Sequence, residues 1–206
     1  RKAERESREE AILSAAERLF FSRGYDAVTM NDIAREAGFT KRTLYAYVQS
    51  KERLALAISL RGYRILNADI ESALSASGPS GFDNLEAASS AITRFAQEKS
   101  GYFDVITDYS PSPSDFGSED GLTVSCYEEG ERAQSTIIGA IGRGLEDGSI
   151  RKGIDPAQAA FFLWSALVGL RKIARLKGAY LSALRPAESG IVPMDFIALV
   201  ALMFRP

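Results

Sequence analysis

Residues 22–54, SRGYDAVTMNDIAREAGFTKRTLYAYVQSKERL, decide the fold of this chain. Thr29 is followed three residues later by Asp32, a capping-box pattern that predicts the start of a helix. An Ala-Gly-Phe turn comes next, in which Gly38 suits the left-handed backbone conformation that commonly ends a helix. Thr40 can then cap a second helix. The stretch therefore predicts two short helices joined by a three-residue turn.

The second of these helices combines an apolar face with a basic first turn. Leu44 and Val48 are four residues apart, so they share one face and are expected to point toward a core. The first turn is Lys41-Arg42-Thr43, and two tyrosines, Tyr45 and Tyr47, follow it. This is a helix-turn-helix, a motif that places the N-terminal part of its second helix in the DNA major groove.

The same segment resembles the DNA-binding domain of the TetR repressor family. The family pattern is roughly Thr-x-x-x-Ile-Ala-x-x-Ala-Gly-Val-Ser-x-x-Thr-Leu-Tyr-x-(His/Tyr)-Phe-x-Ser-Lys-x-x-Leu, and residues 29–54 meet nearly every fixed position. The chain departs from it at Arg42, where the family often has glycine, and at Val48, where it usually has phenylalanine. The resemblance covers about residues 8–60; beyond them it rests on helix order alone.

The motif and the resemblance together imply a set of DNA contacts. Arg42 can donate two parallel hydrogen bonds to guanine, and the family uses the position of Tyr47 for phosphate. Lys51, at the start of the next helix, is expected on a phosphate. The threonines could instead only cap their helices, and Tyr45 could pack against the first helix. The expected DNA-binding residues are Thr29, Thr40, Lys41, Arg42, Thr43, Tyr45, Tyr47 and Lys51.

The charge distribution favours a local contact with nucleic acid. The net charge is −2, but residues 41–64 hold six Lys or Arg and one Glu, whereas the rest of the chain has 19 basic and 26 acidic residues. A basic patch on an acidic body is the electrostatic footprint of a phosphate-binding surface. The alternative is that this run is only a solvated helix face.

Hydrophobic periodicity predicts an all-α protein with about nine helices. A three-helix DNA-binding domain is expected at 1–49, and a helical effector-binding and dimerisation domain at 50–206. Residues 110–117 are expected to form a loop. The expected helices are about 4–22, the two of the motif, 50–76, 82–98, 101–109, 119–147, 156–177 and 194–204.

The helix at 156–177 is apolar nearly all round, so it must be buried on several sides. We expect one face of this helix to pack against its own subunit and another against a second copy of the chain. Palindromic DNA needs two such DNA-binding domains, which are called reading heads below. A single central core helix is the alternative. The expected dimer residues are Leu163, Ala166, Leu170, Phe196, Leu199, Val200 and Met203.

Aromatic residues ahead of that helix and within it could line an apolar cavity for a small hydrophobic or aromatic effector. They could also be core residues without a cavity, and the C-terminal domain could then bind a protein partner or only dimerise. The expected ligand-binding residues are Tyr102, Phe103, Ile106, Tyr109, Phe116, Tyr127, Phe161, Trp164 and Val168.

The composition argues against catalysis. The chain has no histidine, its single cysteine is Cys126, and it contains no phosphate-binding loop or nucleophile motif. An enzyme remains a remote alternative, and no cofactor or metal is expected. Charges interrupt the most apolar stretch, 155–181, so no membrane span is expected. Because no apolar leader is visible and only one cysteine is present, we expect a cytoplasmic protein.

These observations predict a ligand-responsive transcriptional regulator, most simply a homodimeric repressor on a palindromic operator. They do not identify the effector, the operator or the regulated genes. They also leave open whether the protein represses or activates.

Overall fold

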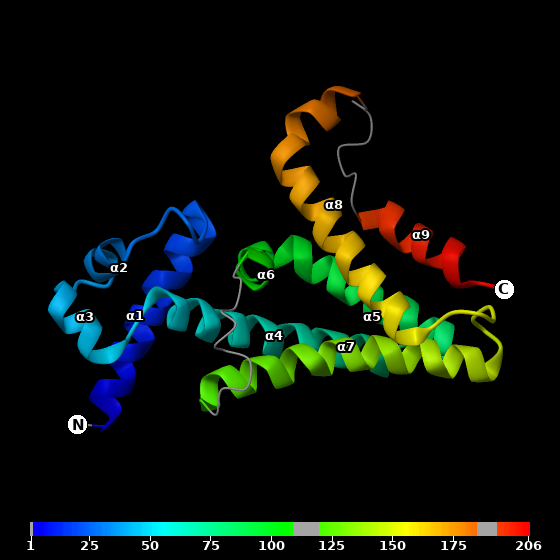
Figure 1. Ribbon diagram of the computed structural model, residues 1–206, viewed down its shortest axis with the longest axis horizontal. Coiled ribbons are helices and arrows are strands. Elements are labelled where there is room, and N and C mark those ends of the chain that lie inside the picture. The colour runs from blue at the N-terminus through cyan, green and yellow to red at the C-terminus, as the bar shows by residue number, and fades with distance from the viewer. Residues whose placement is uncertain (1, 109–119, 185–192) are drawn as a thin grey trace. The chain divides into compact units, whose positions relative to one another are not determined.

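The computed structural model describes residues 2–108, 120–184 and 193–206, and these residues form nine α-helices and no strand (Figure 1). The prediction of an all-helical chain is confirmed. The expected loop at 110–117 and the expected ligand residues Tyr109 and Phe116 lie outside the described residues. The helices are α1 (Lys2–Arg23), α2 (Met30–Glu36), α3 (Lys41–Tyr47), α4 (Lys51–Ser75), α5 (Gly81–Glu98), α6 (Ser100–Asp108), α7 (Gly121–Asp147), α8 (Pro156–Leu184) and α9 (Pro193–Phe204).

Internal contacts divide the chain into two compact units. Unit 1 holds residues 1–65 and 99–129, and unit 2 holds residues 66–98 and 130–206. The helices α4 and α7 contribute residues to both. This division differs from the boundary after residue 49, because the first half of α4 packs with α1–α3. The functional boundary at residue 49 stays a prediction.

Unit 1 is built on one apolar core beneath the helix-turn-helix. α1, α2, α3, the start of α4 and α6 all contribute buried side chains to it. Leu44, the only fully buried residue of α3, anchors that helix to the others. The core consists of Ile12, Ala16, Leu19, Phe20, Val28, Ile33, Ala34, Leu44, Leu54, Ala55, Ile58 and Val105.

α6 lies close against α1 because a glycine faces the aromatic ring of α1. A Cβ at Gly101 would lie 2.3 Å from Cγ of Phe21. The Phe21 ring in turn meets the Tyr102 ring edge to face, with centroids 4.9 Å apart. Any side chain at Gly101 would therefore push α6 away from α1.

Tyr102 joins three helices of unit 1 through the carboxylate of Glu17. Its hydroxyl donates to Oε1 of Glu17, 2.9 Å away, and the same carboxylate accepts from Nη1 of Arg61 at 3.0 Å. Burial, and then the bond to Glu17, raises the pKa of Tyr102, so its hydroxyl stays a donor. The expected role of Tyr102 in an effector pocket stays a prediction. Phe103 is fully buried in unit 1.

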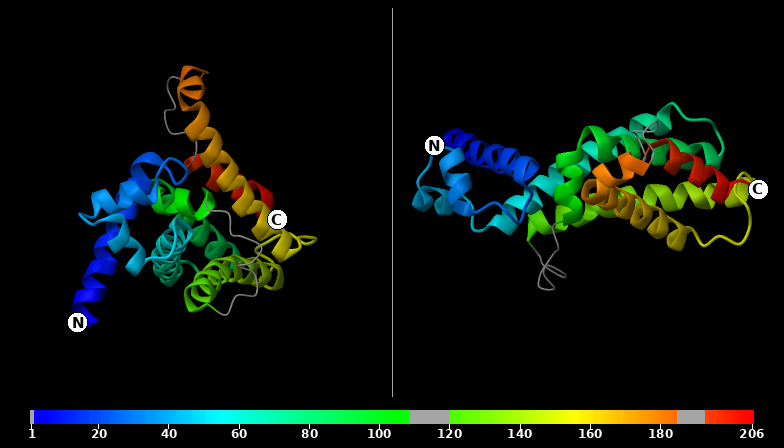
Figure 2. Two further views of the ribbon diagram at one scale, coloured as in Figure 1. Left: turned by 60° about the vertical axis from the view of Figure 1, so that its left-hand side comes forward. Right: turned by 90° about the horizontal axis from the view of Figure 1, so that it is seen from above.

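Unit 2 packs α5 against α9 and against the end of α7. The two helices α5 and α9 are in extensive contact (Figure 2). The start of α5 touches α7 closely, because a Cβ at Gly81 would lie 2.0 Å from the backbone N of Gly144. Asp155 caps α8 by accepting from the backbone N–H of Gln158 at 2.8 Å.

α8 is longer than expected. It runs to Leu184, but the backbone is non-helical at Lys177, with φ −123° and ψ 16°. The helix end predicted near Lys177 therefore corresponds to a kink.

Candidate nucleic-acid interface

Two side-chain caps set the start of α2 and of α3. Thr29 Oγ1 accepts from the backbone N–H of Asp32 at 3.2 Å, and Asp32 accepts from the N–H of Thr29 at 3.0 Å. The turn between the helices contains Gly38 with a φ of +73°. Thr40 caps α3 by accepting from the N–H of Thr43 at 3.1 Å. The predicted capping box, glycine turn and second cap are all present.

The exposed face of α3 carries the basic first turn. Lys41 and Arg42 are exposed, and neither forms an ion pair or side-chain hydrogen bond within the described part of the chain. Tyr45 is 46% exposed, and the ammonium of Lys41 lies 6.0 Å from the centroid of its ring. Two cations and one aromatic ring are thus presented together, and packing of Tyr45 against α1 is not what the structure shows.

Tyr47 contacts α1, but its hydroxyl proton stays available for a hydrogen bond. Its ring packs against the core of unit 1, and its hydroxyl oxygen accepts from Nη1 of Arg8 at 3.4 Å. Since arginine has no acceptor, the hydroxyl proton of Tyr47 is not used in this contact. A phosphate oxygen can still accept it, so the phosphate role of Tyr47 stays a prediction.

The threonine hydroxyls differ in what they can offer to DNA. Thr29 Oγ1 donates to Oδ2 of Asp32 at 2.6 Å, so its proton is used inside the cap and a phosphate role is not supported. Thr40 Oγ1 and Thr43 Oγ1 are 2.8 Å apart. Only one proton can lie between two hydroxyl oxygens, so the other one can be donated to a phosphate.

Lys51 is turned inward, contrary to the expected phosphate contact. Its Nζ lies 3.0 Å from the carbonyl oxygen of Tyr25 and 3.1 Å from that of Val28. It also lies 4.1 Å from the centroid of the Tyr25 ring. The two carbonyls and the ring face occupy the three donors of the ammonium group. Lys51 therefore makes an internal contact in the structure, and the expected phosphate contact stays a prediction.

The other basic residues of the segment 41–64 are also paired within unit 1. Arg53 donates to Asp120 at 2.8 Å, Arg61 to Glu10 and Glu17 at 2.9 and 3.0 Å, and Arg64 lies 3.6 Å from Glu129. The Arg53 bond, with two bonds from Thr123, lowers the pKa of Asp120 to about 2. Carboxylates thus pair with Arg53, Arg61 and Arg64, neutral groups bind Lys51, and Lys41 and Arg42 remain available.

Sequence reasoning missed the residues that support this surface. Arg8, Glu17 and Tyr25 contact side chains that are 39, 44 and 26 residues away in the chain. No local spacing links such partners, so no periodic pattern could have indicated them. Only the capping and turn residues carried a short-range signal.

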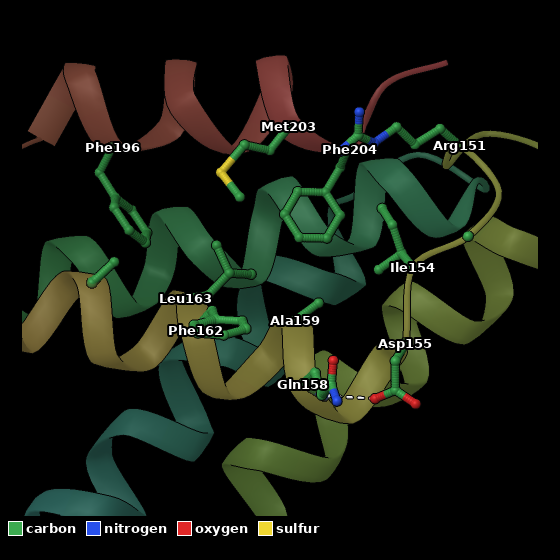
Figure 3. Close-up of a pocket in the computed structure, with 12 residues that line it drawn as sticks. Arg151, Ile154, Asp155, Gln158, Ala159, Phe162, Leu163, Phe196, Met203 and Phe204 are labelled. Atoms are coloured by element: carbon green, nitrogen blue, oxygen red, sulfur yellow. Dashed lines mark hydrogen bonds between the residues drawn. The ribbon is translucent and has the colours of Figure 1, made fainter.

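Unit 2 contains an apolar pocket of about 400 Å³ between α8, α9 and the segment that precedes α8 (Figure 3). Four expected dimer residues line it: Leu163, Ala166, Phe196 and Met203. None of the expected ligand residues that the structure describes does so. The remaining lining residues are Arg151, Gly153, Ile154, Asp155, Gln158, Ala159, Phe162 and Phe204.

An apolar stripe on α8 faces solvent in the single chain. The stripe consists of Phe162, Ala166, Gly169, Ile173 and Leu176, at intervals of three or four residues. Phe162, Ile173 and Leu176 are 63%, 51% and 79% exposed. Nothing lies within 4 Å of a Cβ built at Gly169, so this side of the helix is open. An unpartnered stripe of this kind marks an interaction surface.

Several expected residues take other positions in unit 2. Phe196 and Val200 are buried inside unit 2, whereas Leu202 on the same helix is 80% exposed. The side chain of Leu199 lies outside what the structure describes, and Leu170 is half-buried. Phe161, expected in a ligand pocket, is exposed, while Trp164 and Val168 are half-buried.

The helix-turn-helix matches a known family. Residues 12–58 match the model described as bacterial regulatory proteins, tetR family. An uncharacterized HTH-type transcriptional regulator of Mycobacterium tuberculosis is 46% identical over 59 residues, which are 29% of this chain and 29% of the relative. The sequence likeness to this relative therefore spans less than a third of either chain.

Solved structures extend the likeness of fold over nearly the whole chain. PfmR, a TetR family transcriptional regulator from Thermus thermophilus, matches with a TM-score of 0.65 and 23% identity, covering 93% of this chain and 96% of that one. AibR in complex with isovaleryl coenzyme A and operator DNA matches with a TM-score of 0.68 and 20% identity, covering 97% and 99%. At these identities the likeness concerns the fold alone.

No helix in the described ranges is both long enough and apolar enough to cross a membrane.

Proposed function

The chain belongs to the TetR family of transcriptional regulators, and on this premise we propose that it is a homodimeric repressor that binds a palindromic operator through α3 and releases it when a small hydrophobic effector binds. The family is not one of enzymes, so the remote enzymatic alternative is set aside. Because such a regulator must reach its operator, we propose that this protein acts in the cytoplasm.

The observation that carries the DNA-binding proposal is the exposed, unpaired first turn of α3. Lys41 and Arg42 stand at the helix end that a helix-turn-helix inserts into the major groove. The guanidinium of Arg42 can bind O6 and N7 of guanine together, and Tyr45 beside it can contact a thymine methyl group. Tyr47 and the Thr40–Thr43 pair offer donors for flanking phosphates.

Selection from a random DNA pool tests this function. The full-length protein should enrich an inverted repeat whose half-sites are one helical turn of about 34–36 Å, or a multiple of it, apart. Footprinting of the enriched duplex should protect both half-sites equally. Enrichment of no sequence, or of a single asymmetric half-site, would contradict a dimeric operator-binding protein.

The dimer is proposed to form through the α8 stripe and the exposed part of α9. The stripe places two small residues, Ala166 and Gly169, between larger ones, and the open side of Gly169 allows another helix to approach closely. Leu202 and Met203 on α9 add exposed apolar surface. The pocket of about 400 Å³ belongs to this surface, because Phe162, Ala166 and Met203 line it, and a partner side chain can fill it.

The effector proposal rests on α8 and on a relative of the same fold. Trp164 and Val168 are half-buried on a side of α8 that differs from the exposed stripe. AibR was crystallised with an acyl coenzyme A and with operator DNA. Because α4 has residues in both units, it supplies a covalent route from an effector in unit 2 to the reading helices. The competing proposal keeps DNA binding but gives unit 2 no small ligand.

Trp164 reports on the effector because it is the single tryptophan of the chain. An apolar effector bound beside it should change its fluorescence and should weaken operator binding. Linkage requires that the operator weaken effector binding by the same factor, for which a coupling of about 1–3 kcal/mol is typical. Candidate compounds are titrated with and without operator while the emission is followed.

A compound with equal affinity in both titrations does not shift the DNA equilibrium. A Trp164→Phe variant controls for quenching by free compound, since its signal should stay flat. If every binding compound is insensitive to the operator, the effector proposal fails and the partner-binding or dimerisation-only proposal replaces it. The DNA-binding proposal is unaffected by that outcome.

A further inference from the structure

Lys51 fixes the segment between α1 and α2 to the first turn of α4. Its ammonium group binds the carbonyl oxygens of Tyr25 and Val28 and lies over the ring of Tyr25. A hydrogen bond with a charged donor is stronger than one between neutral groups. Three contacts from one group therefore hold residues 25–28 in one position relative to α4.

The ring beneath the ammonium is itself held on two sides. Tyr25 meets Phe20 of α1 edge to face, with ring centroids 5.4 Å apart. Its hydroxyl donates to Oε1 of Glu52 at 3.4 Å. Hydrogen bonds from the Glu52 backbone and from Ser50 hold the pKa of Glu52 below its usual value, so this acceptor is charged at neutral pH. The contact joins α1, the segment 25–28 and α4.

The segment that Lys51 holds leads directly into the reading helices. Val28 is buried, and the next residue, Thr29, is the N-cap of α2. α2 in turn packs against α3. A shift of the two carbonyl oxygens would therefore move the start of α2, and with it the face of α3 that carries Arg42.

We propose that Lys51 is a positioning residue for operator recognition and makes no contact with DNA: it sets the orientation of α2 and α3 relative to α4. The inference rests on the proposed DNA-binding function and deepens it. The position of Lys51 next to the helix-turn-helix suggests a phosphate contact. The proposal gives this lysine an internal role instead.

Salt dependence separates the two roles. Each phosphate that a protein neutralises on duplex DNA changes the slope of log K against log salt by about −0.9. A phosphate contact by Lys51 in both protomers would thus contribute about −1.8 to the slope. A positioning residue contributes nothing to the slope on random DNA, but its loss lowers the affinity for the operator.

The experiment compares three full-length variants with the wild type. Lys51→Met keeps the side-chain stem but removes the charge, Tyr25→Leu removes the ring but keeps the charge, and the third carries both substitutions. Lys99→Met, at an exposed lysine of unit 1, is the matched control for the loss of charge. Affinities for the selected operator and for a random duplex of equal length are measured over a salt series, with folding checked by circular dichroism.

Lys51→Met and Tyr25→Leu should each weaken operator binding about tenfold, the effect of losing one charge-assisted contact. Random-DNA affinity and its salt slope should stay close to the wild-type values, so the ratio of operator to random affinity falls. The double variant should be no weaker than Lys51→Met, because both substitutions break one contact. Simple loss of folded protein lowers binding to both duplexes equally and leaves that ratio unchanged.

A slope on random DNA that becomes shallower by about 1.8 in Lys51→Met would show a phosphate contact and overturn the proposal. Equal losses on the two duplexes, or an unchanged operator affinity, would also overturn it. Tyr25→Leu keeps the test decisive if Lys51→Met does not fold. A wild-type protein that binds neither duplex would instead overturn the proposed DNA-binding function.

Discussion

Arg42→Ala should weaken operator binding strongly and binding to random DNA only slightly. Arg42 is exposed and unpaired within the described part of the chain, and it lies in the first turn of α3, where side chains reach base edges. A bidentate arginine–guanine pair contributes about 1–3 kcal/mol of base discrimination per half-site. The operator preference should therefore fall by a factor of about 5 to 150 per half-site, as measured by fluorescence anisotropy on both duplexes.

The control for this prediction is Arg64→Ala. Arg64 also carries one positive charge, but it lies on α4 beside Glu129 rather than on the reading face. Its loss should leave the base preference unchanged. A repeated selection with Arg42→Ala should show relaxed preference at one position in each half-site. If both duplexes lose affinity equally, Arg42 binds a phosphate and does not read a base.

The local structure of the reading head was predictable because short-range hydrogen bonds define it. Thr29 and Asp32 cap each other across three residues, and Thr40 caps α3 through Thr43. Gly38 adopts the positive φ that its place after α2 predicts. Each of these features depends on residue types within one helical turn, which the sequence displays directly.

The side-chain partners of the same region were not predictable, because folding brings them together from distant positions. The residues 41–64 look like a basic patch in the sequence, yet Lys51, Arg53, Arg61 and Arg64 are paired within unit 1. A charge count contains no information about pairing. The phosphate contacts that a salt titration should reveal are consequently fewer than the sequence suggests.

The sequence also did not predict which side of each C-terminal helix is buried. The apolar character of α8 predicted that it is covered on several sides, but periodicity could not tell which side of α8 or of α9 faces the chain itself. Phe196 and Val200 point into unit 2, whereas Phe162 and Leu202 point outward. When nearly every position is apolar, the helical period gives no preferred face.

Ile173→Glu should convert a dimer into a monomer. Ile173 lies in the middle of the α8 stripe and is exposed in the single chain, so a glutamate there is tolerated by the isolated subunit. In a dimer that covers the stripe, the carboxylate would be buried without a partner, at a cost of several kcal/mol. Light scattering should show the mass falling from twice the chain mass to the chain mass of 22.4 kDa.

The monomeric variant should also bind the operator much more weakly than the dimer does. Joining two reading heads makes the second half-site contact intramolecular, a gain of about 10²–10⁴ in affinity that disappears when the dimer dissociates. Ser135→Glu places the same charge at an exposed position of α7 and should leave both the mass and the operator affinity unchanged. Circular dichroism should show equal helix content in the two variants, because neither residue is buried in the chain. A wild type that is monomeric at micromolar concentration, or an Ile173→Glu variant that still dimerises, would show that another surface joins the protomers.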